Sequence, residues 1–347
     1  MMTDQVRFPA EWEPQSGVLL TWPHRHSDWR PVLHDVEPVY VEIARHIARF
    51  ERLVILCWDD DHRGHIESAL TAAGVAGTNI RYFPVPTNDT WVRDYGPVTV
   101  VQDGAPLLLD FSFNSWGNKY ACDKDNLVST RLLDGGLFGE TRMRVADMVL
   151  EGGSIETDGQ GTLLTTSRCL LSPQRNPGLD KGAIEARLAA VLGVDRILWL
   201  NAGELRGDDT DGHIDILARF CTPDTLAYTR CDDPPDENHP ALARMEEELR
   251  ALRTRDGAPY ELVPLPWPRA QFSADGQRLA AGYANFLVVN GAVMVPVYRD
   301  PADEPALRVL EQCFPGREVV PIYCHPLLPQ GGSLHCATMQ LPRGVLE

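Results

Sequence analysis

The sequence has few basic residues for its acidic content. It contains 32 Lys and Arg residues against 49 Asp and Glu residues, so the formal net charge is −17 with histidine neutral. Binding to nucleic-acid phosphates or to anionic membrane surfaces needs clustered positive charge, so neither partner is expected. The acidic balance instead favours a small cationic ligand.

Long apolar runs and paired cysteine motifs are also missing. No apolar run approaches 18 residues, so no membrane-spanning helix is expected, and residues 1–15 lack the apolar core of a secretory signal. The eight cysteines include no Cys-x-x-Cys pair and are not spaced as a disulfide scaffold. We therefore expect reduced thiols and a cytoplasmic protein.

Three common cofactor motifs are absent as well. The chain has no Gly-x-Gly-x-x-Gly fingerprint, no Gly-Lys-Ser/Thr phosphate-binding loop and no His-Glu-x-x-His motif. A metal held by His213 and Asp215 with His325 or His335 stays an alternative, although this spacing matches no standard zinc pattern. The prediction is a site with no metal and no organic cofactor.

What remains predicts an α/β protein with one domain over residues 1–347. Apolar or β-branched runs alternate with amphipathic segments along the whole chain, and no low-complexity linker interrupts them. The predicted helices are 31–50, 62–73, 123–133, 180–192, 241–253 and 303–313. The predicted strands are 17–22, 53–58, 97–101, 107–113, 162–166, 196–200, 214–221, 286–289, 292–298 and 319–323.

Local signals support some of these boundaries. Asp180 can cap the helix that follows it, and Gly193 can end that helix.

A strand–helix–strand unit recurs faintly every 60 to 70 residues. The pattern alone does not separate a repeat from a doubly wound sheet.

Two segments place carboxylates beside loops and glycines. In residues 90–97, Thr-Trp-Val-Arg-Asp-Tyr-Gly-Pro, Asp94 could bind a planar cation while Trp91 supplies an aromatic wall. The alternative is a turn with a surface pair of Arg93 and Asp94. Glu151 precedes two glycines that would allow close approach of backbone or of a ligand, and the alternative there is a tight turn with an exposed glutamate.

Residues 208–216, Asp-Asp-Thr-Asp-Gly-His-Ile-Asp-Ile, are the most informative stretch. If the chain is extended, alternate residues share one face, so Asp209, Asp211, His213 and Asp215 would project together. Carboxylates around one imidazole would raise the pKa of His213 and prepare it as an acid. The alternative is a solvated edge strand.

A second glycine pair precedes Cys336 in residues 330–338, Gln-Gly-Gly-Ser-Leu-His-Cys-Ala-Thr. His335 and Cys336 are adjacent, so on an extended segment they point to opposite faces and do not form a base–nucleophile pair. The other cysteines stand mostly in apolar or helical contexts, where a small buried hydrophobe is the ordinary interpretation. Cys122 and Cys231 lie among acids, and no role is predicted for them.

The four motifs occur in an order that resembles the agmatine deiminase branch of the guanidine-modifying superfamily, with bacterial peptidylarginine deiminases as near relatives. The resemblance covers about residues 8 to 342 and carries over residue by residue. It implies a five-bladed α/β propeller of ββαβ units, the pentein fold, around a central site. The implied roles are nucleophile for Cys336, acid/base for His213, its partner for Glu151, guanidinium-binding carboxylates for Asp94 and Asp215, and a site aromatic for Trp91.

The resemblance implies hydrolysis of agmatine to N-carbamoylputrescine and ammonia through a cysteine thiouronium, with no cofactor. Asp209 is a candidate for binding the distal amine, together with Asp208 and Asp89. Two departures from the family pattern, Ser333 with the 337–340 tail and Ile216 after Asp215, bear on the choice of substrate. The alternatives are a deiminase of peptidylarginine or arginine, an amidinotransferase, a non-catalytic guanidine-binding protein, and a metal hydrolase. The sequence allows a homo-oligomer and does not determine the oligomeric state.

Overall fold

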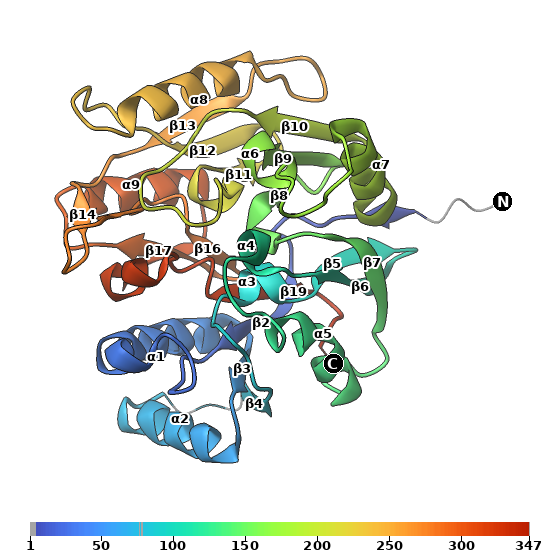
Figure 1. The fold of residues 1–347 in the computed structure, drawn as a ribbon, viewed down its shortest axis with the longest axis vertical. Coiled ribbons are helices and arrows are strands. Elements are labelled where there is room, and N and C mark those ends of the chain that lie inside the picture. Colours follow the sequence, from blue (N-terminus) through green and yellow to red (C-terminus); the bar gives the residue numbers. More distant parts are fainter. Residues whose placement is uncertain (1–4, 76, 78, 347) are drawn as a thin grey trace.

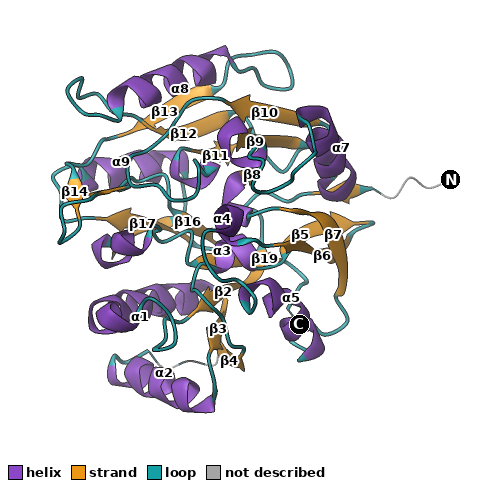
Figure 2. Ribbon diagram, viewed as in Figure 1, coloured by secondary structure: helices purple, strands orange, loops and turns teal. Residues whose placement is uncertain are grey.

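The structure consists of small mixed α/β sheets with helices toward the outside of the molecule (Figures 1 and 2). The computed structural model describes residues 5–75, 77 and 79–346. The short helices α3 (Val92–Tyr95) and α4 (Ser115–Asn118) lie near the middle of the view in Figure 1. This arrangement confirms the predicted α/β class.

Five sheets of the described chain contain the same strand unit. In each unit a first strand pairs antiparallel with a second, and the second pairs parallel with a third. The recurrence that is faint in the sequence is therefore real. In the order first, second and third strand, the units are β19 (Thr338–Pro342), β2 (Gln15–Thr21), β3 (Arg52–Cys57); β5 (Val98–Gln102), β6 (Ala105–Ser112), β7 (Arg142–Val149); β8 (Ile155–Thr157), β9 (Thr162–Thr166), β10 (Arg196–Leu200); β11 (Ala218–Thr222), β12 (Thr225–Thr229), β13 (Glu261–Leu265); and β16 (Leu287–Val289), β17 (Ala292–Val297), β18 (Glu318–Tyr323).

A helix lies in the crossover between the second and third strand of every unit. Parallel strands need such a crossover, because a tight hairpin joins only antiparallel neighbours. The crossover helices are α1 (Leu33–Phe50), α5 (Val128–Asp134), α7 (Lys181–Leu192), α8 (His239–Ala251) and α9 (Asp303–Cys313). Asp180 caps α7 by accepting from the Ala183 amide at 2.8 Å, and Gly193 ends it in a left-handed conformation, as predicted.

Shorter elements complete the architecture. Strand β1 joins the unit of β5, strand β4 joins the unit of β3, and β14 pairs with β15. Among them, the 3₁₀ turn η4 contains the predicted site residue Asp215, and Glu151 directly precedes η3. The bounds are β1 (Val6–Arg7), β4 (Ile80–Pro84), β14 (Gln271–Phe272), β15 (Arg278–Leu279), α2 (Asp60–Ala72), α6 (Ser167–Leu170), η1 (Arg30–Val32), η2 (Asp125–Leu127), η3 (Gly152–Ser154), η4 (Ile214–Ile216) and η5 (His325–Gln330).

The predicted helices are confirmed to within a few residues, whereas one strand is misplaced. Residues 214–221 were expected to be extended throughout, but Ile214–Ile216 form η4 and the strand begins only at Ala218. Strands β7, β12, β13 and β19 were not predicted from the sequence. In β7 the alternation of exposed and buried residues changes phase at Val145, which is apolar but exposed, so the segment has no single regular period.

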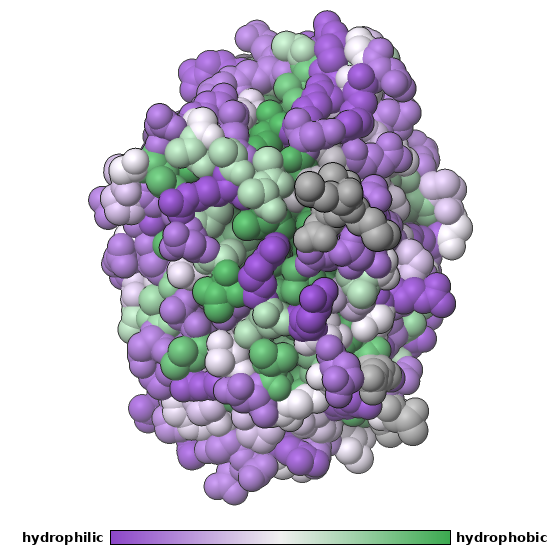
Figure 3. Space-filling model, turned by 90° about the vertical axis from the view of Figure 1, so that its right-hand side faces the viewer, coloured by the Kyte–Doolittle hydropathy of each residue, from purple (hydrophilic) through white to green (hydrophobic). Residues whose placement is uncertain are grey.

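The outer surface fits the charged composition. On the face shown in Figure 3, hydrophilic residues cover most of the surface and apolar residues form smaller patches between them. Among the helices that the structure describes, none combines the length and the apolar character that crossing a membrane requires.

Candidate active site

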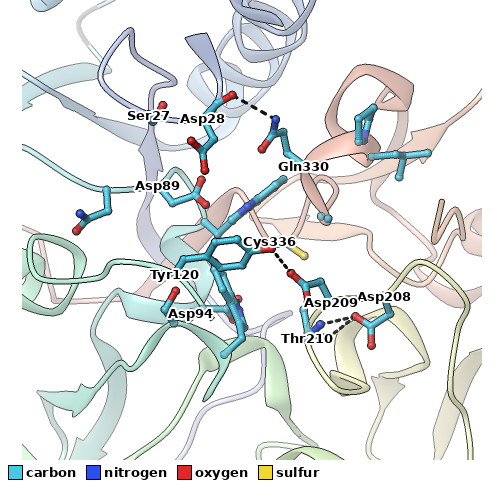
Figure 4. Close-up of a pocket in the computed structure, with 18 of the residues that line it drawn as sticks. Ser27, Asp28, Asp89, Asp94, Tyr120, Asp208, Asp209, Thr210, Gln330 and Cys336 are labelled. Atoms are coloured by element: carbon cyan, nitrogen blue, oxygen red, sulfur yellow. Dashed lines mark hydrogen bonds between the residues drawn. The ribbon is translucent and has the colours of Figure 1, made fainter. Parts of the chain in front are cut away.

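A cavity of about 610 Å³ brings together residues that are far apart in the chain. Its lining includes Trp91, Asp94, Asp209 and Cys336, which come from three separate segments around α3, η4 and the turn before β19. In Figure 4 the Cys336 sulfur lies among acidic side chains from opposite sides of the pocket. Four of the predicted site residues therefore face one space.

Asp94 projects from α3 into this cavity and is 3% exposed. Its Oδ1 accepts a hydrogen bond from the Gly153 amide at 3.0 Å, and its Oδ2 accepts from the Trp116 indole at 2.9 Å. Burial raises the pKa of Asp94, which the charge of His213 partly offsets. The alternative of a surface pair with Arg93 is wrong, because Arg93 is equally buried and bonds to the main chain of His335.

Gly153 provides the space in which three side chains meet. A Cβ atom at this position would lie 2.6 Å from His213 Nδ1, 2.9 Å from Asp94 Oδ1 and 3.0 Å from Asp215 Oδ2. A methyl group cannot occupy such a position without displacing these atoms. The expected close approach of backbone is confirmed at Gly152, where a Cβ atom would lie 2.1 Å from the Arg93 carbonyl oxygen, whereas close approach of a ligand stays a prediction.

His213 and Glu151 form a buried pair. His213 Nε2 lies 3.2 Å from Glu151 Oε2, and both side chains are 0% exposed, so the alternative of an exposed glutamate is wrong. Burial alone would lower the pKa of His213, but the charge of Asp94 and hydrogen bonds with Cys169 and Glu151 raise it well above its usual value. The raised pKa favours the protonated imidazolium form of His213.

Arg175 holds Glu151 in place and was not predicted from the sequence. Its Nε lies 2.7 Å from Glu151 Oε2, its Nη1 donates to Asp211 Oδ2 at 2.7 Å, and its Nη2 donates to the Thr210 carbonyl at 2.8 Å. Burial would raise the pKa of Glu151, but His213 and Arg175 lower it. One guanidinium thus links the partner of His213 to the loop that precedes His213.

The segment before His213 is a folded loop and not the expected extended strand. The Asp208 carboxylate accepts from the Thr210 amide at 2.9 Å and from the Gly212 amide at 2.7 Å, which coils the chain. Asp211 takes a left-handed conformation with φ 67°. The expected common face of Asp209, Asp211, His213 and Asp215 is therefore wrong: Asp209 lines the cavity, Asp211 binds Arg175, and His213 and Asp215 are fully buried.

Asp215 connects the nucleophile candidate to a second histidine. Its Oδ2 lies 3.7 Å from Cys336 Sγ and 2.9 Å from His335 Nδ1. The other ring nitrogen of His335 lies 2.8 Å from Glu11 Oε2, on the side away from the cavity. The expected extended segment with His335 and Cys336 on opposite faces is wrong, because residues 334–337 form a turn and both side chains contact Asp215 Oδ2.

The electrostatic surroundings of Cys336 disfavour a thiolate in the free protein. Burial raises the pKa of Cys336 well above its usual value, and the charges of Asp215 and Asp94 raise it further. A cation placed between these carboxylates and the sulfur would offset their charges and so lower the pKa of Cys336.

The other carboxylates that line the cavity are those of Asp28, Asp89, Asp208 and Asp209. Asp209 accepts from the Tyr120 hydroxyl at 2.6 Å and lies 3.1 Å from Lys119 Nζ (Figure 4). Asp89 accepts at Oδ1 from the Trp29 indole at 2.7 Å, and burial raises the pKa of Asp89 to about 6.

Asn285 is a second residue that the sequence analysis missed. It is 2% exposed and precedes β16, and its Nδ2 lies 3.4 Å from Cys336 Sγ. The signal that could have found it is a single polar residue in the apolar run from Tyr283 to Val289.

One cluster of the described residues has the ligand spacing of a metal site. Glu151, Cys169 and His213 offer ligand atoms within 4.8 Å of one another. Glu151 is already paired with the Arg175 guanidinium, whose charge opposes a bound cation. The chemistry of Glu151, Cys169 and His213 therefore does not favour a bound metal.

The fold and the cavity define an α/β protein of repeated mixed sheets with a buried thiol surrounded by carboxylates and an adjacent imidazolium–glutamate pair. The chain belongs to the Porphyromonas-type peptidyl-arginine deiminase family, whose model matches residues 7–342. This assignment confirms the resemblance found in the sequence.

Relatives match almost the full length of the chain. It is 36% identical to agmatine deiminase from Pseudomonas aeruginosa, over 98% of this chain and 96% of the relative. It is likewise 36% identical to agmatine deiminase from Pseudomonas syringae, over the same shares. The structure of agmatine deiminase from C. jejuni with substrate bound superimposes with a TM-score of 0.91 at 34% identity, covering 99% of this chain and 98% of that one.

Proposed function

We propose that the protein is a hydrolase that deiminates agmatine to N-carbamoylputrescine and ammonia. The observation that carries this proposal is the Cys336 thiol, 3.7 Å from the Asp215 carboxylate in a cavity that it shares with Asp94. A thiol in this setting becomes a nucleophile when a cation neutralises the carboxylates. The full-length relatives named agmatine deiminases support agmatine as that cation.

Asp94 and Asp215 would orient the guanidinium. A guanidinium is planar and permanently charged, so two carboxylates can accept its N–H groups and fix its plane against the sulfur. Trp91 is 3% exposed and lines the same cavity, where its ring would pack against the cation. The bound charge then favours the thiolate, and the thiol proton passes to solvent.

The reaction would proceed in two halves. The Cys336 thiolate attacks the guanidinium carbon, His213 donates its proton to one nitrogen, and ammonia leaves a thiouronium bound to sulfur. His213, now neutral and oriented by Glu151, takes a proton from water as the hydroxide adds to the same carbon. The second adduct expels the thiolate and releases a urea group, and His213 regains its acid form.

We further propose that the distal ammonium of agmatine lies between Asp89 and Asp209. Replacing either carboxylate by its amide (Asp89→Asn or Asp209→Asn) should raise KM for agmatine about tenfold with little change in kcat, as expected for one lost charge contact. Because burial raises the pKa of Asp89 to about 6, KM should also rise as the pH falls through that value and the carboxylate takes up a proton.

Butylguanidine, which has no distal amine, is the matched control substrate. Its KM should be the same for the wild-type protein and both variants, and it should not depend on the protonation of Asp89. Equal changes in KM for the two substrates would show that these carboxylates act through the general shape of the cavity.

A substrate panel tests the proposed reaction itself. We expect kcat/KM for agmatine to exceed that for arginine and for a peptidylarginine by at least 100-fold in an ammonia-release assay. The acidic cavity attracts the distal ammonium of agmatine, whereas arginine adds a carboxylate that the cavity repels and a peptidylarginine has no distal ammonium. Deimination of peptidylarginine or arginine is the second candidate function, favoured by the family description and by Lys124 in the cavity lining. A preference for either substrate would replace agmatine while keeping the cysteine chemistry.

We also propose that the five strand units close into a five-bladed propeller and that residues 1–347 form a single catalytic domain. The repeated ββαβ order supports this architecture, and the meeting of α3, η3 and η4 supports a central site. A cytoplasmic location remains part of the proposal, with the acidic composition and the eight unpaired cysteines as its support.

A further inference from the structure

His335 contacts Asp215 from outside the active-site cavity and has no part in the reaction proposed above. Its side chain is buried, and it is not among the residues that line the cavity. Its Nδ1 lies 2.9 Å from Asp215 Oδ2, and its Nε2 lies 2.8 Å from Glu11 Oε2. Each nitrogen of the ring therefore faces a carboxylate oxygen.

Two ionised carboxylates require two N–H donors from the His335 ring. An ionised carboxylate only accepts hydrogen bonds, and a neutral imidazole has one N–H group, so the imidazolium alone satisfies both partners. Burial would raise the pKa of Glu11, but the charges of Arg219 and His335 lower it well below its usual value. Glu11 also accepts from the Arg219 guanidinium at 2.8 Å and from the Val288 amide at 2.7 Å, which favours its ionised form.

Beyond Glu11 the buried charges continue to alternate in sign. Arg219 donates from Nη2 to Glu11, and it donates from Nε to Glu156 Oε2 at 2.6 Å. Removing one member of a buried set of opposite charges leaves its neighbours uncompensated. In this row His335 is the cation in contact with Asp215.

The contact with His335 acts on a carboxylate that would bind the guanidinium. Burial would raise the pKa of Asp215, but the hydrogen bond and the charge of His335 lower it, as do the charges of His213 and Arg219. Asp215 Oδ1 is buried and has no hydrogen-bond partner among the residues that the structure describes, so it can accept an N–H group of a substrate. The other titratable groups with which Asp215 interacts electrostatically are Arg93, Asp94 and Cys336.

We propose that His335 is a positioning residue that, as an imidazolium, keeps the Asp215 carboxylate ionised and oriented for the substrate guanidinium. This inference rests on the proposed function, because it assigns His335 a role in substrate binding for that reaction. His335 transfers no proton and does not touch the reacting carbon. It acts through Asp215.

Agmatine binding to a Cys336→Ala protein measures this role without turnover, because that variant cannot attack the guanidinium carbon. Isothermal titration calorimetry gives the Kd for agmatine across a range of pH in this background, alone and combined with His335→Gln or His335→Asn. Neither amide carries a charge. The asparagine amide can still donate an N–H group to Asp215, whereas the glutamine amide extends to the position of Nε2, which faces Glu11.

We expect the affinity of the Cys336→Ala background for agmatine to fall at acidic pH as Asp215 takes up a proton. Removing the imidazolium raises the pKa of Asp215, so in His335→Gln this loss of affinity should move to higher pH. Near neutral pH its Kd should rise about tenfold, and it should return towards the background value as the pH is raised. His335→Asn should show a smaller change, because one hydrogen bond to the carboxylate is kept.

His62→Asn in the same background is the matched control. His62 is a half-buried histidine of α2 whose Nδ1 accepts from the Trp58 amide at 3.0 Å, and it does not line the active-site cavity. Its Kd for agmatine should stay within about twofold of the background at every pH, as expected for a change away from the site.

A purely structural role for His335 would weaken agmatine binding equally at every pH. That result, or a Kd that keeps the background pH dependence, overturns the inference. Circular dichroism establishes which variants are folded, and either His335 variant decides the question if the other does not fold. If the wild-type protein releases no ammonia from agmatine but Cys336→Ala binds it with the pH change that depends on His335, the inference is supported and the proposed function fails.

Discussion

Replacing Cys336 by Ala is expected to reduce ammonia release from agmatine to the uncatalysed background. The variant has no atom that can bond to the guanidinium carbon, and a water molecule in its place is a far weaker nucleophile than a thiolate. The fold should persist, because alanine is small enough to fit a site in the cavity wall. The measurement is ammonia release at saturating agmatine, together with a melting curve.

Cys57→Ala is the matched control for this prediction. Cys57 is also a buried thiol, 1% exposed, but it ends strand β3 and does not line the active-site cavity. It should lose some stability through the small void and keep turnover within about twofold of wild type. Measurable deimination by Cys336→Ala would remove this cysteine from the mechanism.

Replacing His213 by Asn should lower kcat by about 10²- to 10⁴-fold, the usual contribution of a general acid–base group. Asparagine keeps a polar side chain in the pocket but cannot donate a proton to the departing ammonia or take one from water. The pKa of His213 is raised well above its usual value, so wild-type activity should decline only as the pH rises past that raised pKa. The variant should lack this alkaline decline.

The control for His213→Asn is the reactivity of Cys336 towards iodoacetamide. If the substitution removes only the acid–base group, the thiol stays in place and is still alkylated. A variant that keeps wild-type kcat, or that keeps the alkaline decline, would show that another group performs the proton transfers.

Much of the site could be predicted from local sequence because the reaction needs unusual residues in short motifs. Asp94 stands between Trp91 and Gly96, Glu151 precedes two glycines, and Cys336 follows a glycine pair. The structure places Asp94 and Cys336 in the lining of one cavity, with the buried Asp215 carboxylate 3.7 Å from the Cys336 sulfur. The helices could also be predicted from the sequence, because an amphipathic helix such as α1 buries apolar residues at regular spacing.

The remaining features depend on contacts between distant segments, which a local pattern does not contain. The loop at Asp208–Gly212 coils because one carboxylate accepts several amide hydrogens, so the expected alternation of faces fails. Arg175 acts across 24 residues on Glu151, and Asn285 across 51 residues on Cys336. Neither residue belongs to a short sequence motif. Each meets its partner only because the fold buries the two side chains together.

The most direct test of the account is to stop the wild-type reaction with acid during turnover of agmatine and to analyse the protein by mass spectrometry. A sulfur–carbon bond between substrate and enzyme should appear as an amidine adduct on the peptide that contains Cys336. An adduct on a different cysteine, or steady ammonia release with every peptide unmodified under conditions that trap such adducts, would contradict it.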